Sequence, residues 1–265
     1  MDKQKTTIAQ LKAYKSQQQI SMLTCYDYLF SQLMEEAGID CILVGDSVGT
    51  NVLGYKSEKE VTLEDMIHHT KAVARGNNFS LIIVDLPYKT YVTPNQALHS
   101  AQQLIQAGAD AVKFEGYYPD IVTVLKNNNI NVVCHLGLLP QTAVKKTVQA
   151  LDADSIQTLY RQALDLEQLG ADMMIVELIP EEVANVLTKK LSIPLIGIGA
   201  GRFCDGQVQI IYDVMGLTKK QFKHVNRFFA LRDRLSETLV AYKKRVQQCN
   251  YLDITHSFHV DLLSK

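Results

Sequence analysis

Gly38-Ile39-Asp40-Cys41-Ile42-Leu43-Val44-Gly45-Asp46 is the stretch that decides the fold, because its pattern recurs along the chain. A helix-ending glycine is followed by a short apolar run, and a carboxylate ends the run. Segments 108–115 and 170–177 repeat this order, and segment 81–85 has the same apolar body and acidic end. Glycine in a left-handed conformation stops helices, and such apolar runs are typical of strands buried on both faces. The pattern therefore predicts parallel strands that alternate with helices.

The rest of the chain extends this alternation to eight units. Strands are predicted near residues 20–25, 41–46, 81–86, 111–115, 131–136, 173–178, 194–199 and 207–212. Helices are expected at about 27–37, 62–75, 95–107, 119–127, 153–169 and 181–190, with a long one near 221–248. The connection between the last two strands is too short for a regular helix. We predict an α/β protein with a (β/α)8 TIM barrel. It would form one domain over residues 1–265, with a short N-terminal helical lead-in and a long C-terminal helix.

Composition limits the partners and the compartment. The 265 residues are 47% hydrophobic and 21% charged, with a formal net charge of −1 and no long run of one sign. That balance argues against nucleic acid or an anionic membrane as a partner and favours a small molecule. The five cysteines contain no C-x-x-C pair, and no run of 18 apolar residues occurs. With the polar N-terminal residues, these features predict a soluble cytoplasmic protein whose thiols are reduced.

Three acids end the predicted second, third and fourth strands: Asp46, Asp85 and Glu115. In a barrel of this kind the carboxyl ends of the strands converge on one face, which carries the chemistry. Three neighbouring carboxylates repel one another and have raised pKa values unless a cation lies among them. Mg²⁺ prefers such oxygen ligands and seldom needs a complete protein cage. The alternative is that these are ordinary solvated acids, or partners of nearby lysines.

Other polar residues are expected at the same face. Lys113 lies two residues before Glu115, so both side chains point to the same side of a strand. The barrel interior near the mouth is favoured, where Lys113 would bind a substrate carboxylate or form a structural ion pair. His135 ends the fifth strand, and we expect it to support the site rather than bind the metal. Glu177 stands two strands away from the acidic trio, which suits proton transfer. The glycines of 197–201 do not fit a dinucleotide motif.

Several motifs, in order from about residue 5 to 260, resemble ketopantoate hydroxymethyltransferase. They are Thr24-Cys25-Tyr26-Asp27-Tyr28, Leu43-Val44-Gly45-Asp46-Ser47-Val48-Gly49, Asp85-Leu86-Pro87-Tyr88, Val112-Lys113-Phe114-Glu115-Gly116, His135-Leu136-Gly137-Leu138, Gly197-Ile198-Gly199-Ala200-Gly201, Cys204-Asp205-Gly206-Gln207 and His256-Ser257-Phe258-His259. The resemblance implies a barrel that binds Mg²⁺. It also implies transfer of a hydroxymethyl group from 5,10-methylenetetrahydrofolate to 3-methyl-2-oxobutanoate through a Mg-stabilised enolate, giving 2-dehydropantoate in pantothenate synthesis.

The same resemblance assigns roles to individual residues. Asp46 and Asp85 correspond to metal ligands that also contact the substrate, and Glu115 completes the metal site. Ser47 and Lys113 correspond to substrate contacts. Glu177, in Val176-Glu177-Leu178-Ile179-Pro180, falls where the family has its general base. The family also implies a large homo-oligomer, a decamer.

One loop departs from the family pattern. After Leu138 the family usually continues with Thr-Pro-Gln and a glycine-rich stretch, whereas residues 139–150 are shorter and lack those glycines. This difference in the loop puts two properties in question, the affinity for folate and the turnover. Two alternative functions stay open: a Mg-dependent carbon–carbon lyase or phosphonomutase of the related keto-acid barrel type, which would also use acidic strand ends, or a non-catalytic paralogue that binds the keto acid but has lost turnover through the altered loop.

Overall fold

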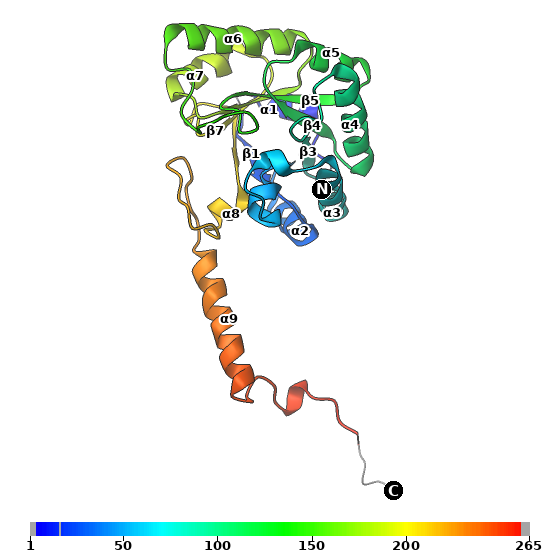
Figure 1. The fold of residues 1–265 in the computed structure, drawn as a ribbon, viewed down its shortest axis with the longest axis vertical. Helices are drawn as coiled ribbons and strands as arrows, with labels where there is room; N and C mark the ends of the chain where they lie inside the picture. Colours follow the sequence, from blue (N-terminus) through cyan, green and yellow to red (C-terminus); the bar gives the residue numbers. More distant parts are fainter. Residues whose placement is uncertain (1–3, 16, 261–265) are drawn as a thin grey trace. The chain divides into compact units, whose positions relative to one another are not determined.

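A closed barrel of parallel strands is the centre of the fold in the computed structural model, which describes residues 4–15 and 17–260 (Figure 1). Over those residues eight strands pair in sequence order, and β8 returns to β1. This confirms the predicted (β/α)8 barrel. The strands are β1 (Ile20–Thr24), β2 (Cys41–Val44), β3 (Leu81–Asp85), β4 (Ala111–Glu115), β5 (Asn131–Gly137), β6 (Met173–Glu177), β7 (Leu195–Ile198) and β8 (Gly206–Gln209).

Helices flank the barrel strands and follow the predicted ranges closely (Figure 1). Side chains such as Asp27 and Thr93 cap their first turns by accepting a backbone N–H, and Gly38 and Gly108 end two of them in left-handed conformations. Short turns, η1 (Gly49–Leu53) and η2 (Glu58–Glu60), lie between β2 and the next helix. The helices are α2 (Tyr28–Ala37), α3 (Leu63–Arg75), α4 (Pro94–Ala107), α5 (Pro119–Asn127), α6 (Ala153–Gln168) and α7 (Glu181–Lys190).

The recurring Gly-x-Asp spacing has a structural explanation at the amino ends of the strands. Asp40, Asp110 and Asp172 each accept a backbone N–H of the preceding strand at 2.9 Å. Each acid therefore fixes the start of one strand against its neighbour. Lysines compensate two of these charges: Lys5 lies 2.6 Å from Asp110, and Lys126 pairs with Asp172.

The barrel interior is apolar at this end and is closed by the expected lead-in helix, α1 (Ile8–Tyr14). Leu11 of α1 is fully buried in a cluster with Met22 of β1 and Met173 of β6. Lys12 and Lys15 of the same region pair with acids that precede β6 and β8. Because the described residues fill the amino end with apolar side chains, the carboxyl end of the barrel is the end where chemistry is expected.

Contacts within the chain divide it into two compact units, which we describe separately. One comprises residues 1–211 and 222–225 and holds the barrel. The other comprises residues 212–221 and 226–265 and holds α9 (Leu231–Gln247), η3 (Ile254–His256) and most of α8 (Ile211–Val214). Residues 1–3, 16 and 261–265 of the expected single domain lie outside the described residues, and the single domain stays a prediction.

Two ranges predicted for the C-terminal region are wrong. The helix predicted over 221–248 begins only at Leu231, because Phe228 and Leu231 donate their N–H groups to the distant carbonyls of Val214 and Met215 at 2.9 and 3.0 Å. The strand predicted to reach residue 212 ends at Gln209. There Ile211 donates its N–H to the Thr24 hydroxyl at 3.2 Å and opens α8.

Candidate active site

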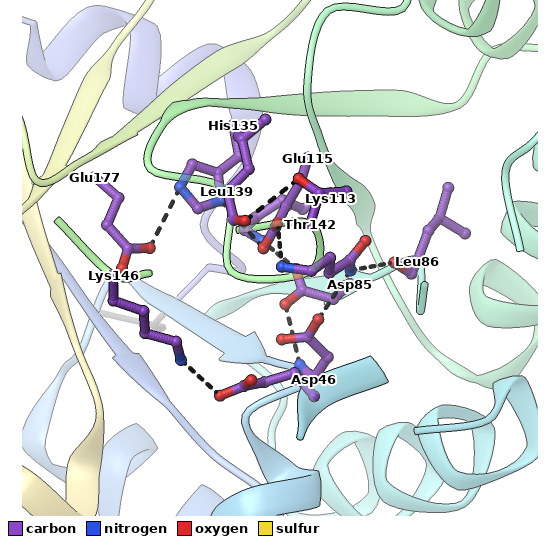
Figure 2. Close-up of polar contacts among 12 residues, drawn as sticks. Asp46, Asp85, Leu86, Lys113, Glu115, His135, Leu139, Thr142, Lys146 and Glu177 are labelled. Carbon is purple, nitrogen blue, oxygen red and sulfur yellow. Dashed lines mark hydrogen bonds and ion pairs between the residues drawn. The ribbon is translucent and has the colours of Figure 1, made fainter. Parts of the chain in front are cut away.

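The predicted site residues converge at the carboxyl end of the barrel, around one cavity of about 110 Å³ (Figure 2). The close-up shows Asp46, Asp85 and Lys113 together, with Glu177 on the other side of His135. All seven residues named from the sequence line this cavity: Asp46, Ser47, Asp85, Lys113, Glu115, His135 and Glu177. The structure thus brings the whole predicted set together, although their individual roles stay predictions.

Strand register explains why these side chains meet. Asp85 pairs with Lys113 across β3 and β4, and Glu115 pairs with His135 across β4 and β5. Asp46 comes two residues after β2, beyond Gly45. A Cβ at position 45 would lie 3.0 Å from the Ser47 hydroxyl oxygen, so the close approach of this turn favours glycine.

The next strand pair needs a glycine for a stronger reason. Gly137 of β5 lies opposite Glu177 of β6 and has a φ of +88°. A side chain there would be strained and would collide with the Glu177 carbonyl oxygen. Gly137 therefore lets β6 approach closely enough to bring Glu177 to the cavity.

Lys113 is the central cation of the site. Its Nζ lies 2.7 Å from Asp85 Oδ1, and both side chains are about 95% buried. The other oxygen of Asp85, Oδ2, accepts the Asp46 backbone N–H at 3.0 Å. Burial opposes the charge on Lys113, but the charges of Asp85, Glu115 and Asp46 outweigh it and raise the lysine pKa. Lys113 is therefore cationic, and its expected placement inside the mouth is confirmed.

Asp46 and Glu115 add negative charge to the site beyond what Lys113 neutralises. Burial, reinforced by the charge of Asp85, raises the pKa of Asp46 to about 7. Burial also raises the pKa of Glu115 to about 9, with Lys113 opposing the shift and Asp46 adding to it. A second cation in this cluster would relieve both shifts.

His135 lies between the two halves of the site. Its Nδ1 is 3.7 Å from Glu115 Oε1, and its Nε2 is 3.5 Å from Glu177 Oε2 (Figure 2). Burial, then the Lys113 charge, lowers the His135 pKa well below its usual value, so the ring is neutral. Burial raises the pKa of Glu177 to about 7, which is the range of an effective proton acceptor at neutral pH.

Three residues absent from the sequence-based set also belong to the site. Lys146, from the loop after β5, lies 3.0 Å from Glu58 Oε1, and both line the cavity. Gln141 from the same loop is fully buried beside Asp46 and Glu115. Loop residues do not follow the hydrophobic periodicity by which strands and helices are predicted from a sequence. The signal that could have found Gln141 is the Pro140-Gln141 pair, which matches the Pro-Gln of the family's Thr-Pro-Gln although residue 139 differs.

The carboxylates of the site fit a hard divalent cation if water and substrate oxygens supply the remaining ligands. Within residues 4–15 and 17–260, no three His, Cys, Asp or Glu side chains lie close enough together to hold a metal ion by themselves. Mg²⁺, however, is commonly bound by one or two carboxylates plus water and substrate oxygens. Asp46 and Asp85 supply two adjacent buried carboxylates with excess negative charge. The residues present thus fit Mg²⁺, and Glu115 as a direct ligand stays a prediction.

Larger cavities elsewhere contain fewer charged side chains that could take part in catalysis. One of about 740 Å³ beside α4 is lined mainly by amide side chains, with His99 and Asp110. Asp110 is already paired with Lys5. Convergent buried charges make the barrel mouth the better candidate, although its cavity is smaller.

The barrel and its acidic mouth define a class of enzymes that work on a small molecule at the carboxyl ends of the strands. A family model described as Ketopantoate hydroxymethyltransferase matches residues 5–253, and the chain belongs to this family. The resemblance seen in the motifs is therefore confirmed.

Individual relatives agree with this family. A 3-methyl-2-oxobutanoate hydroxymethyltransferase of Dehalococcoides mccartyi (strain CBDB1) is 42% identical, covering 97% of this chain and 95% of its own. One from Thermoanaerobacter sp. (strain X514) is 39% identical and covers 98% of both. Among solved structures, a phosphoenolpyruvate phosphomutase from Streptomyces platensis subsp. rosaceus has a TM-score of 0.64. Its sequence identity is 13%, and the match covers 91% of this chain and 88% of that one, so it shows the shared fold alone.

Across the part of the chain that the structure describes, none of the helices has the length and apolar character needed to cross a membrane.

Proposed function

We propose that this protein transfers a hydroxymethyl group from 5,10-methylenetetrahydrofolate to 3-methyl-2-oxobutanoate, giving 2-dehydropantoate for pantothenate synthesis. Membership in the family supports the reaction type. The observation that carries the proposal is the position of Glu177, across the cavity from Asp46, Asp85 and Lys113. A basic carboxylate thus faces a cluster suited to an α-keto acid.

The substrate would be held by the charged side of the mouth. Lys113 offers a buried ammonium for the substrate carboxylate, and the Ser47 hydroxyl, oriented by the Tyr26 hydroxyl at 2.9 Å, offers a polar contact beside it. Asp46 and Asp85, with Glu115 next to them, would hold Mg²⁺. When bound, Mg²⁺ would polarise the keto group and make the neighbouring C–H bond more acidic.

Glu177 would then take the proton from C3 of the keto acid. Its raised pKa of about 7 makes the carboxylate a stronger base than an exposed glutamate. The His135 ring, whose Nε2 lies 3.5 Å away, is neutral and so forms no ion pair with the Glu177 carboxylate. The deprotonated carbon would form a C–C bond with the one-carbon unit of the folate. The C–N bonds of that unit break with the addition of one water, so tetrahydrofolate leaves and the water oxygen becomes the hydroxyl of the product.

We also propose a cytoplasmic homo-oligomer, a decamer by family resemblance. The support lies in the C-terminal unit: every residue of α9 is described, and none is buried. Large apolar side chains of this helix are exposed, including Leu239 at 67% and Val240 at 64%. Exposed apolar surface of this kind marks an interaction site.

Deuterium exchange at C3 of 3-methyl-2-oxobutanoate tests the proposal. In D₂O with Mg²⁺, wild-type protein should catalyse exchange without folate and form product only when the folate is added. Binding of the keto acid by calorimetry without exchange or product would indicate the non-catalytic paralogue instead. Release of pyruvate or glyoxylate from a 2-hydroxy acid would indicate the lyase.

A further inference from the structure

Gln141 makes four hydrogen bonds at the centre of the site. Its Nε2 donates to Asp46 Oδ2 at 2.8 Å and to the Leu86 carbonyl at 3.0 Å. Its backbone N–H donates to Glu115 Oε2 at 2.8 Å, and its Oε1 accepts from the Tyr91 hydroxyl. One loop residue thus contacts two of the three acids assigned to the cation, and its side chain is fully buried.

These contacts fix the orientation of the amide. In the opposite orientation, Oε1 would face Asp46 Oδ2 and the Leu86 carbonyl, which are both acceptors. The Tyr91 hydroxyl would at the same time face the NH₂ group rather than an acceptor. The donor group of Gln141 is therefore directed at Asp46.

We propose that Gln141 is a positioning residue for the cation site. It occupies Oδ2 of Asp46 and Oε2 of Glu115, which would leave Oδ1 of Asp46 and Oε1 of Glu115 for a bound cation. The inference rests on the proposed function, because it assumes that these acids bind a divalent ion. Partners that orient metal ligands in this way commonly change metal affinity 10- to 100-fold when they are removed.

Alternative side chains at this position would act differently. Methionine has a similar shape but removes the two Nε2 donors and leaves the backbone N–H. Glutamate would place a further acceptor against Asp46 Oδ2 and the Leu86 carbonyl, and would add negative charge to a cluster that already has an excess. Methionine should therefore weaken cation binding, whereas the added negative charge of glutamate would itself attract a cation, so methionine is the variant that isolates the positioning role.

The test measures Mn²⁺ as the probe ion, by calorimetry and by electron paramagnetic resonance, in the full-length protein with and without 3-methyl-2-oxobutanoate. Gln141→Met should raise the Mn²⁺ Kd about 10- to 100-fold. Tyr91→Phe should raise it less, because only the orientation of the amide is loosened.

Two controls separate positioning from general stability. Asn77→Leu removes another buried amide, which bonds to Ser80 at the amino end of β3 away from the site, and should leave the Kd unchanged. Leu125→Ala opens a cavity under α5 and should lower the melting temperature without changing the Kd. If Gln141→Met does not fold, Gln141→Asn takes its place, since it is too short to reach Asp46 but keeps the backbone contact.

The outcomes are distinct. A folded Gln141 variant with wild-type Mn²⁺ affinity would overturn the positioning role while the proposed function stands. Wild-type protein that binds no Mn²⁺, even with the keto acid, would overturn the cation site itself and this inference with it. A higher Kd in both Gln141→Met and Leu125→Ala would reduce Gln141 to a structural role.

Discussion

Replacing Glu177 by glutamine should make the protein less active and more stable. The Glu177 side chain is only 16% exposed, and burial raises its pKa from 4.5 to about 7, against the opposing charges of Lys113 and Lys146. The folded state therefore holds the ionised carboxylate at a cost. Glutamine keeps the size of the side chain but has no charge to bury.

The size of the effect follows from the pKa. At roughly 1.4 kcal/mol per pKa unit, the shift from 4.5 to about 7 amounts to about 3.5 kcal/mol as an upper bound. Below pH 4.5 the carboxyl is protonated in both states, and the cost vanishes. Between pH 4.5 and about 7 the folded state binds more protons than the unfolded state, so wild-type stability falls as pH rises. Above pH 7 the variant should be more stable by roughly 1–3 kcal/mol.

Activity should move in the opposite direction. Loss of a general base costs roughly 10²- to 10⁴-fold in kcat. Binding of the keto acid, which relies on Lys113 and the aspartates, should survive. The rise of kcat/KM with pH that accompanies ionisation of Glu177 should disappear in the variant.

Urea unfolding of metal-free protein at pH 5 and pH 8, together with product formation by variant protein shown to bind the keto acid, measures both effects. Glu182→Gln on the exposed side of α7 is the matched control and should change neither. Turnover close to wild type in Glu177→Gln would refute the assignment and make His135 the next candidate base. Equal stability of the two proteins at both pH values would refute the account of the buried charge.

Three further changes test the rest of the site. Lys113→Ala should raise the KM for the keto acid and lower kcat/KM by an amount equivalent to ~2–4 kcal/mol of transition-state stabilisation, because it removes a buried cation 2.7 Å from Asp85. Steady-state kinetics with each substrate varied would show this, and an equal loss of kcat/KM for folate would point to a structural ion pair. Asp85→Asn should weaken Mg²⁺-dependent binding of the keto acid in calorimetry, and undiminished activity at limiting Mg²⁺ would contradict the metal assignment. Lys146→Met should raise the pKa of Glu177 further, since the Lys146 charge lowers it; the rise of kcat/KM should move to higher pH, and an unchanged profile would exclude this electrostatic contact.

Local sequence patterns determined the barrel. The helix-ending glycines and short apolar runs act within a few residues, so they fix the order and type of the elements whatever the rest of the chain does. The same patterns put Asp85, Glu115 and Glu177 at strand ends, where barrel geometry brings them to one face. The predicted helix over 221–248 started ten residues too early, because the hydrogen bonds that hold Phe228 and Leu231 come from residues distant in sequence.

Tertiary structure alone decided how the site residues contact one another. Register places Asp85 against Lys113 and Glu115 against His135, and a shift of one residue would have sent these side chains to the other face of the sheet. Gln141 has no periodic signal, and only the folded loop brings its amide to Asp46. The raised pKa of Glu177 has the same origin, because burial depends on every segment that packs around a group and not on its sequence neighbours.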